Sequence, residues 1–214
     1  ITSGALIRAA VPLSESAALE SGEAMLTSDT TVTWDGGKVR GRRVLRLGAI
    51  ELSSTPVRPD PVRARHVALE AVRSGGLDVA SLTKNGESLR RRLALAHRVF
   101  GDPWPDVSDE ALLARAEEWL DLDALAAGRG SDATSGLRGL LGWRESARLD
   151  EVVPETITVP SGSRIRIDYP EPGSDTSPVL AVKLQECFGW ADGPTVCDGR
   201  VRVVLHLLSP ARRP

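Results

Sequence analysis

Residues 30–47, TTVTWDGGKVRGRRVLRL, decide the fold of the first part of the chain. In their first half, threonines alternate with Val32 and Trp34, which is the two-residue period of a strand with one buried face. The DGG triplet that follows is a strong turn signal, because glycine adopts the backbone conformations that tight hairpins require. Residues 38–47 then continue as a second strand. The stretch therefore predicts a β-hairpin.

The residues on either side of this hairpin extend the strand pattern over residues 1–58. A short apolar run contains Leu6 and Ile7, and Gly48 separates the hairpin from a further apolar stretch at 49–52. A hairpin-rich segment of this length fits a small β-barrel, and an OB-like fold is the leading prediction. Short barrels of other kinds stay open as alternatives.

Residues 59–153 have the sequence pattern of helices. Asp60 is a good N-cap and Pro61 a good first helical residue, so a helix is predicted to start there and to end at Gly75-Gly76. Apolar residues at helical spacing predict three further helices. These are a helix at 87–100, one that starts after Ser108, and one at 137–152, with a loop at 128–136.

Residues 154–214 return to a strand pattern, because Ile165, Ile167 and Tyr169 alternate with polar residues. Strands are predicted at 156–159, 164–169, 179–182 and 201–208, with a short helix in KLQECFG at 183–189. The predicted fold class is therefore α+β. It has an N-terminal OB-like small β-barrel (1–58), a helical middle (59–153) and a C-terminal mixed β-sheet (154–214).

The composition is that of an ordinary globular chain of 214 residues, with 41% hydrophobic and 26% charged residues. No apolar run approaches the roughly 20 residues that a membrane helix needs. The first residues lack the pattern of a secretory signal. We therefore expect a cytoplasmic chain with no membrane partner, in which Cys187 and Cys197 are reduced thiols.

Sequence motifs for catalysis are missing from the chain. A P-loop requires GxxxxGK[ST], in which glycine amides, Lys and a hydroxyl hold phosphate and magnesium, and no such run exists. No DExH segment and no GxSxG occur either. His66, His97 and His206 are scattered and show no metal-ligand spacing. We therefore expect no nucleotide, metal or other cofactor within this chain.

The charges of the chain are segmented, although the net charge is only -2. Residues 38–46 carry five basic side chains and no acid, whereas residues 106–123 carry seven acids and one Arg. Arg40, Arg42 and Arg46 share one parity of the predicted strand and so one face. On a small β-module such a row suits phosphate groups.

Each of these features also has a plainer interpretation. Trp34 is a possible stacking platform for a base, but a Trp on a strand also packs in a core. Arg43 lies opposite the arginine row unless a bulge intervenes. The arginines of the second helix are favoured as a solvated face, paired with the acidic run, and the PSGSR turn at 160–164 as a tight turn rather than an anion site. These arginines are Arg90, Arg91, Arg92 and Arg98.

Long runs in fixed order carry a family resemblance. TVPSGSRIRIDY from Thr158, PVLAVKLQECFGW from Pro178 and VRVVLHLLSPARRP from Val201 resemble the C-terminal block of HrpB-type bacterial ATP-dependent helicases, relatives of the DEAH-box RNA helicases. Two upstream runs are similar to the same family, RLGAIELSSTPVRPDP (46–61) and DPWPDVSDEALLARAEEWL (102–120). The sequence departs from the family pattern in Cys187, where Leu is usual, and in Arg212, where Gly is frequent.

The resemblance implies a parent with two RecA-like motor domains, a winged helix and a helical ratchet bundle, in which the motor domains bind ATP and Mg²⁺. By analogy with related enzymes, the OB-like part helps to grip single-stranded RNA or DNA, and the helicase core is a partner in cis. Arg40, Arg42 and Arg46 are the predicted phosphate contacts. Further candidates for nucleic-acid contact are Trp34, Arg164, Arg166 and Lys183.

Two rival functions remain at this point. The chain is alternatively an interaction appendage that docks a protein partner or the motor domains, which exposed apolar patches favour. It is alternatively an independent small-molecule enzyme, which a deep pocket with titratable groups favours.

Overall fold

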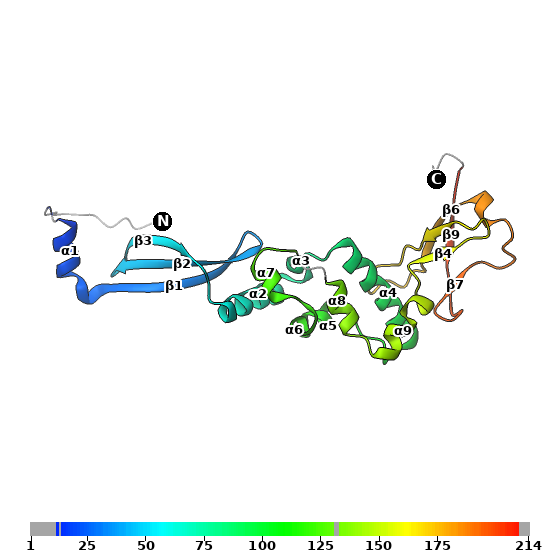
Figure 1. The fold of residues 1–214 in the computed structure, drawn as a ribbon, viewed down its shortest axis with the longest axis horizontal. Helices are drawn as coiled ribbons and strands as arrows, with labels where there is room; N and C mark the ends of the chain where they lie inside the picture. Colours follow the sequence, from blue (N-terminus) through cyan, green and yellow to red (C-terminus); the bar gives the residue numbers. More distant parts are fainter. Residues whose placement is uncertain (1–11, 13, 131–132, 210–214) are drawn as a thin grey trace, which may run out of the picture.

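A computed structural model describes residue 12, residues 14–130 and residues 133–209. Figure 1 shows an elongated chain with an antiparallel sheet at one end, helices in the middle and short strand pairs at the other end. The α+β class predicted from the sequence is therefore confirmed.

The elements within the described residues follow the chain in this order. The helices are α1 (Glu15–Ser21), α2 (Pro61–Gly75), α3 (Leu77–Ala80), α4 (Lys84–Phe100), α5 (Asp109–Ala114), α6 (Ala116–Trp119), α7 (Leu122–Ala126), α8 (Thr134–Gly139) and α9 (Trp143–Val152), with short 3-10 turns η1 (Glu23–Met25) and η2 (Leu184–Cys187). The strands are β1 (Leu26–Asp35), β2 (Lys38–Leu47), β3 (Ile50–Val57), β4 (Thr156–Thr158), β5 (Arg164–Arg166), β6 (Val179–Lys183), β7 (Thr195–Val196), β8 (Val201–Arg202) and β9 (Val204–Leu208).

The predicted hairpin forms as the sequence indicates. β1 and β2 pair along their full length and turn at Gly36 and Gly37, whose φ angles are +57° and +77°. A two-residue turn of this hand matches the right-handed twist of the strands, and it requires residues that accept positive φ. β3 pairs with the other edge of β2, and its bulge places the extra residue, Leu52, on β3.

The predicted closed barrel is not confirmed. Within the described residues, β1, β2 and β3 form an open sheet in that order, and the two outer strands do not pair with each other. The end of the sheet that holds the hairpin turn packs on α2 and α7 instead, so apolar burial comes from helices rather than from strand closure. The strand expected around Leu6 and Ile7 lies outside the described residues.

The first predicted helix is confirmed as α2. Its N-cap Asp60 accepts a hydrogen bond from the backbone N–H of Arg63 at 2.9 Å, and it ends at the glycine pair. α4 begins three residues earlier than predicted, because the hydroxyl of Thr83 caps it by accepting from the N–H of Gly86. The loop predicted at 128–136 is partly helical, since α8 begins at Thr134.

Two helices predicted as continuous are each broken into two. The helix after Ser108 divides at Arg115 into α5 and α6, and residues 137–152 divide at Gly142 into α8 and α9. The breaks let short helices pack at different angles around one core. Gly136 shows how close they come, because a Cβ atom there would lie 1.7 Å from the carbonyl oxygen of Trp119. Trp119 itself is buried, and its indole donates to the carbonyl of Leu112 at 2.9 Å.

The core runs through the helical middle and into the strands that follow it. α4 supplies Leu93, which is completely buried, and β5 leads into Ile167 and Tyr169, which are buried on the same core. The hydroxyl of Tyr169 donates to the carbonyl of Pro154 at 2.7 Å, and burial raises the pKa of that phenol well above its ordinary value. Helices and C-terminal strands therefore share one hydrophobic cluster.

The predicted C-terminal mixed sheet is three separate two-stranded pairs within the described residues. β4 with β5 and β7 with β8 are antiparallel, whereas β6 with β9 is parallel. The strand predicted at 201–208 is interrupted at Val203, which is buried between β8 and β9. The short helix predicted in KLQECFG is present as η2.

Candidate nucleic-acid interface

The three arginines singled out on β2 project from one face of the N-terminal sheet. The register of β2 against β1 is continuous from Lys38 to Leu47, so alternation along β2 is preserved. Arg40, Arg42 and Arg46 therefore lie on one side, and Arg43 lies on the other, as the sequence predicts.

Each of these arginines is held by a polar group at the surface. Arg40 contacts Asp35 at 2.8 Å, and their side chains are 51% and 64% exposed. Arg46 contacts Glu51 at 3.7 Å, with 37% and 50% exposed. Within the described residues Arg42 has no acidic partner, and it donates to the hydroxyl of Ser54 at 3.2 Å. Exposed ion pairs are worth about 0–1 kcal/mol, so an incoming anion can replace either carboxylate at low cost.

Trp34 lies on the opposite face of the sheet from this arginine row. It pairs directly with Val39 across the hairpin, and directly opposed residues point to the same side. Val39 alternates with Arg40 along β2, so Trp34 and the arginines are separated by the sheet. Trp34 is partly buried and packs against the core cluster. One strand of nucleic acid lying on the arginine face cannot also stack on Trp34.

Threonines occupy the arginine face instead, and the sequence reasoning did not assign them a role. Thr27, Thr31 and Thr33 are the cross-strand partners of Arg46, Arg42 and Arg40. The hydroxyls of Thr27 and Thr33 can donate to phosphate oxygens, whereas that of Thr31 already donates to the carbonyl of Arg42 at 3.3 Å. The alternation of threonine in β1 was visible in the sequence, but the register that sets it beside the arginines is fixed only by the turn.

The same face also carries features that oppose a polyanion. Asp29 lies opposite Val44, so an acid and a buried valine interrupt the row between Arg42 and Arg46. The positive and negative charges of this face are nearly balanced, so the face is not a strongly basic patch. Any binding of a nucleic-acid strand here is therefore predicted to be of moderate strength.

The other three candidate cations lie at the far end of the molecule (Figure 1). Arg164 donates to the hydroxyl of Thr156 at 3.0 Å on the neighbouring strand β4. Arg166 donates to the hydroxyl of Ser88 on α4 and pairs with Glu155. Lys183 is the last residue of β6 and has no ion pair in the part of the chain that the structure describes. The structure therefore does not join Arg164, Arg166 and Lys183 to the arginine row on β2.

The arginines of α4 differ from the solvated face predicted for them. Arg90 does pair with the acidic run, through Asp109 and the carbonyl of Val107. The other three bind the loops and the helix that lead to the C-terminal strands. Arg91 pairs with Asp168 and Glu171, and Arg92 pairs with Asp150 and donates to the carbonyl of Val153. Arg98 donates to the carbonyls of Ser174 and Thr176. Arg92 is only 4% exposed. These side chains hold two parts of the fold together.

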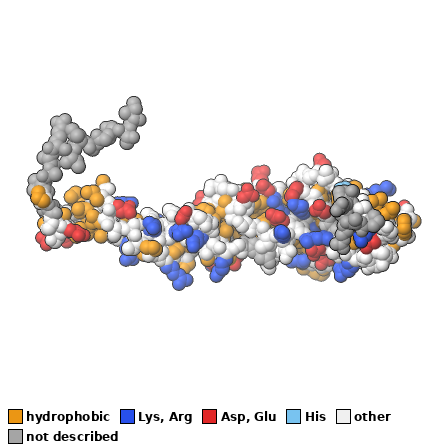
Figure 2. All heavy atoms as spheres, turned by 90° about the horizontal axis from the view of Figure 1, so that it is seen from above, with side chains coloured by type: hydrophobic (Ala, Val, Ile, Leu, Met, Phe, Trp, Pro, Cys, Tyr) orange, Lys and Arg blue, Asp and Glu red, His pale blue; other side chains and the backbone are white. Residues whose placement is uncertain are grey.

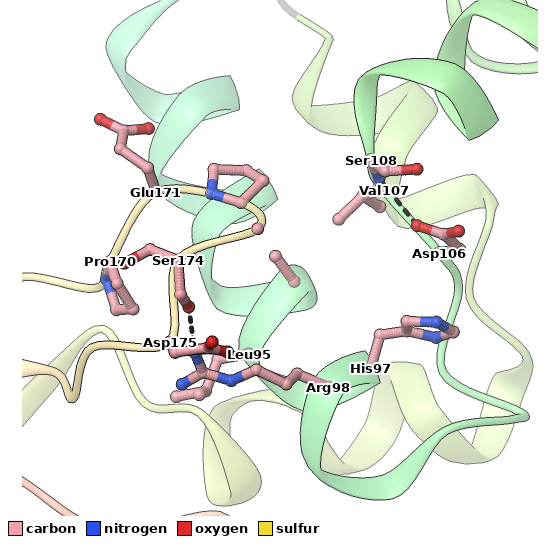
Figure 3. A pocket seen from close by; sticks show the side chains of 13 residues that line it. Leu95, His97, Arg98, Asp106, Val107, Ser108, Pro170, Glu171, Ser174 and Asp175 are labelled. Carbon is pink, nitrogen blue, oxygen red and sulfur yellow. Dashed lines mark hydrogen bonds and ion pairs between the residues drawn. The ribbon is translucent and has the colours of Figure 1, made fainter.

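A cavity of about 240 Å³ lies between α4, the segment before α5 and the loop that follows Tyr169. Figure 3 shows the side chains that line it. The backbone N–H of Ser108 donates to Asp106 at 2.8 Å and lowers the pKa of that carboxyl. The Ser108 hydroxyl accepts from the N–H of Ala111 as a helix cap, and His97 Nδ1 lies 2.7 Å from the carbonyl oxygen of Trp104. Among the described lining residues, no hydroxyl or thiol is paired with a base in the way nucleophilic catalysis requires.

Both cysteines are free thiols, and burial raises the pKa of Cys197 to about 11. Across the described ranges, no group of three or more His, Cys, Asp or Glu side chains is arranged to hold a metal ion. In the same part of the chain, no helix has the length and apolar character needed to cross a membrane.

Similarity to known proteins identifies the family of this chain. Residues 116–214 match the family described as ATP-dependent helicase C-terminal. The chain is 40% identical over 199 residues to the ATP-dependent RNA helicase HrpB of Escherichia coli, and the match covers 89% of this chain and 24% of that protein.

Two crystal structures of E. coli HrpB share the fold of this chain at 38% sequence identity. The one described as a DExH-box NTPase superposes with a TM-score of 0.66 over 92% of this chain and 25% of that chain. The one described as a DEAH/RHA helicase superposes with a TM-score of 0.65 over 89% and 25%.

These matches assign the chain to a class of protein regions, the C-terminal regions of ATP-dependent helicases. Within that class, the chain belongs to the C-terminal region of the HrpB-type helicases, which confirms the resemblance read from its motifs. The chain spans about a quarter of the length of the relatives that it matches.

Proposed function

We propose that this chain is the accessory region of an ATP-dependent RNA helicase and that its N-terminal sheet helps to bind single-stranded nucleic acid. The observation that carries the proposal is the row of Arg40, Arg42 and Arg46 on one exposed face of β2. Guanidinium groups bind phosphate in a forked geometry, and a strand presents them at regular intervals.

The surroundings of the row support a role in binding rather than in stability. Two of the arginines have only exposed carboxylates as partners, and Arg42 has a serine hydroxyl. A phosphate backbone can displace such partners and release counterions from the nucleic acid. The open sheet and the threonines beside the arginines leave this face accessible to an extended strand.

The chemistry of ATP belongs, in this proposal, to motor domains of the parent protein. The matched E. coli structure is described as an NTPase, and this chain covers 25% of it. The 214 residues contain no P-loop and no DExH segment that could bind ATP and Mg²⁺. The chain would act on a strand that the helicase core holds in cis, in the cytoplasm.

The test is binding of labelled single-stranded RNA and DNA across a series of salt concentrations. Replacing Arg40→Gln together with Arg42→Gln should reduce the slope of log K against log salt by about 1.4, since each phosphate contact on a single strand contributes about 0.7. The matched control, Arg144→Gln with Arg202→Gln, removes the same charge from exposed positions outside the sheet. Equal slopes for the two double variants would contradict the proposal.

A docking role is the second candidate, and exposed apolar side chains favour it. Figure 2 shows hydrophobic side chains gathered at both ends of the molecule. Large patches of exposed apolar side chains mark interaction surfaces. A chain that binds the rest of an HrpB-type protein in trans, but has no salt-dependent affinity for RNA, would favour docking over strand binding. The residues are Met25, Leu26, Ile50 and Leu52 at the sheet end, and Leu184, Phe188, Val204 and Leu207 at the other.

A further inference from the structure

A second cavity, of about 300 Å³, lies where the helical middle meets the C-terminal strands. Its lining comes from α4, α8, β5 and the residue before β4, so only the folded chain creates it. Three of the lining residues are arginines and one is an acid. The lining residues are Asn85, Ser88, Leu89, Arg92, Thr134, Arg138, Glu155 and Arg166.

Arg92 lines this cavity and is held in place through two of its nitrogens. Its Nε donates to the carbonyl of Val153 at 2.6 Å, and its Nη2 binds Asp150. Its Nη1 makes no hydrogen bond within the described residues, although the side chain is 4% exposed.

Two further guanidinium groups face the same space from other elements. Arg138 on α8 is exposed and has no ion pair in the described structure. Arg166 on β5 donates to the hydroxyl of Ser88 at 2.9 Å and contacts Glu155 at 3.1 Å. Its side chain and that of Ser88 also line a neighbouring cavity of about 340 Å³ that includes Lys84. Ser88 therefore positions Arg166 between the two cavities.

We infer that Arg92, Arg138 and Arg166 form a binding site for a phosphate group. Arg92 and Arg166 are paired with Asp150 and Glu155, whereas Arg138 has no ion pair within the described residues, so the three guanidinium groups carry one positive charge more than their carboxylate partners. Arg92 is fixed by its buried bonds before any ligand arrives. Guanidinium groups bind phosphate oxygens by charge-assisted hydrogen bonds, and preorganised donors lose little entropy on binding. A volume of this size has room for a phosphate together with an attached sugar.

This site is additional to the proposed binding of single-stranded nucleic acid by the N-terminal sheet, because it shares no residue with the arginine row on β2. The phosphate belongs either to a nucleic-acid terminus or to a small anion in solution. Inorganic phosphate, a 5′-phosphorylated oligoribonucleotide and the same oligoribonucleotide with a 5′-hydroxyl distinguish these sources.

The experiment uses the 214-residue chain and a double variant, Arg138→Gln with Arg166→Gln. Arg92 is left intact, because its bonds to Val153 and Asp150 contribute to stability. Inorganic phosphate should raise the Tm of the unmodified chain relative to chloride at the same ionic strength, because a ligand that binds only the folded state stabilises it. The double variant should bind phosphate at least about tenfold more weakly. The control pair Arg144→Gln with Arg202→Gln should bind as the unmodified chain does.

Tighter binding of the 5′-phosphorylated strand than of the 5′-hydroxyl strand, abolished in the double variant, assigns the phosphate to a nucleic-acid end. An effect of inorganic phosphate alone, also abolished in the double variant, assigns it to a small anion. Phosphate that has no effect on the unmodified chain, or an effect that persists in the double variant, overturns the inference. Arg40→Gln with Arg42→Gln should weaken strand binding while leaving the phosphate effect intact, so the two proposals fail separately.

Discussion

The arginines of β2 and the arginines of α4 are the same residue type in two different roles. On β2 they are exposed, and their partners are exposed carboxylates or a hydroxyl. On α4 they reach backbone carbonyls and acids of segments that are distant in sequence, as Arg92 does with Val153 and Asp150. An arginine whose removal leaves a buried carbonyl unsatisfied contributes to stability, whereas one whose partner is in water remains available to a ligand.

Clusters of arginine in a sequence therefore do not by themselves indicate a surface for nucleic acid. Both runs are dense in Arg, and both are flanked by segments that resemble the same family. What differs is the surroundings: α4 is part of the core and its arginines bind segments that lead to the C-terminal strands, whereas Arg40 and Arg46 of β2 have exposed carboxylates as partners. Substitutions that measure stability and binding separately should therefore divide the two groups.

The largest effect is expected for Arg92→Met. The variant keeps most of the side-chain volume but leaves the buried carbonyl of Val153 without its donor, so the free energy of unfolding should fall by about 2–4 kcal/mol. Urea denaturation measures it. Arg43→Met is the control, because Arg43 is exposed and has no ion pair among the described residues, and it should change stability by less than about 0.5 kcal/mol. Equal losses for the two variants would remove the distinction between α4 and β2.

Trp34→Ala should have the next largest effect, and it should act on stability rather than on binding. Trp34 packs against the core from the face opposite Arg40, so its truncation should cost about 2 kcal/mol. The salt dependence of RNA binding should be unchanged. Weakened binding with unchanged stability would instead assign Trp34 to a base-stacking role.

Asp35→Asn should strengthen strand binding about threefold. The substitution frees Arg40 from its exposed ion pair, which is worth about 0–1 kcal/mol, and removes a negative charge from the arginine face. The control is Asp78→Asn, which changes the net charge equally at an exposed position on α3. RNA affinities at fixed salt decide the matter, and equal gains in both variants would show that net charge alone controls binding.

The smallest effect is expected for Asp123→Asn, and it should depend on pH. Arg65 donates to Asp123 and holds the pKa of that carboxyl below its ordinary value of 3.8. A carboxyl with a lowered folded pKa contributes stability above its unfolded pKa, and this is lost as the pH falls through the folded value. The difference in Tm between the variant and the unmodified chain should therefore be present at pH 7 and shrink progressively as the pH falls below 3.8. A difference that is constant with pH would point to packing instead.

The parts of the fold that were predictable depend on local chemistry. The DGG turn and the Asp60-Pro61 start of α2 are correct because turn and cap residues act within four positions of chain. The barrel, the continuous helix at 137–152 and the single strand at 201–208 were not. Those depend on which surfaces meet in space, as when Val203 turns into the core and divides β8 from β9.

The candidate interface was predictable in part for the same reason. Alternation placed Arg40, Arg42 and Arg46 on one face, and the unbroken register of the hairpin preserves that alternation. The position of Trp34 required one more step, the pairing across the turn, which puts it on the opposite side. The phosphate cavity could not be anticipated, because Arg92, Arg138 and Arg166 come from three elements that meet only through tertiary packing.

The sequence alone determined the family, the hairpin, the first helix cap and the absence of nucleotide-binding motifs from these residues, since each depends on residues that are neighbours along the chain. Only the tertiary structure decided which arginines stabilise the fold and which remain exposed. That distinction depends on solvent access and on partners far apart in sequence, such as Arg92 and Val153, because the energy of a charged group is set by its surroundings after folding.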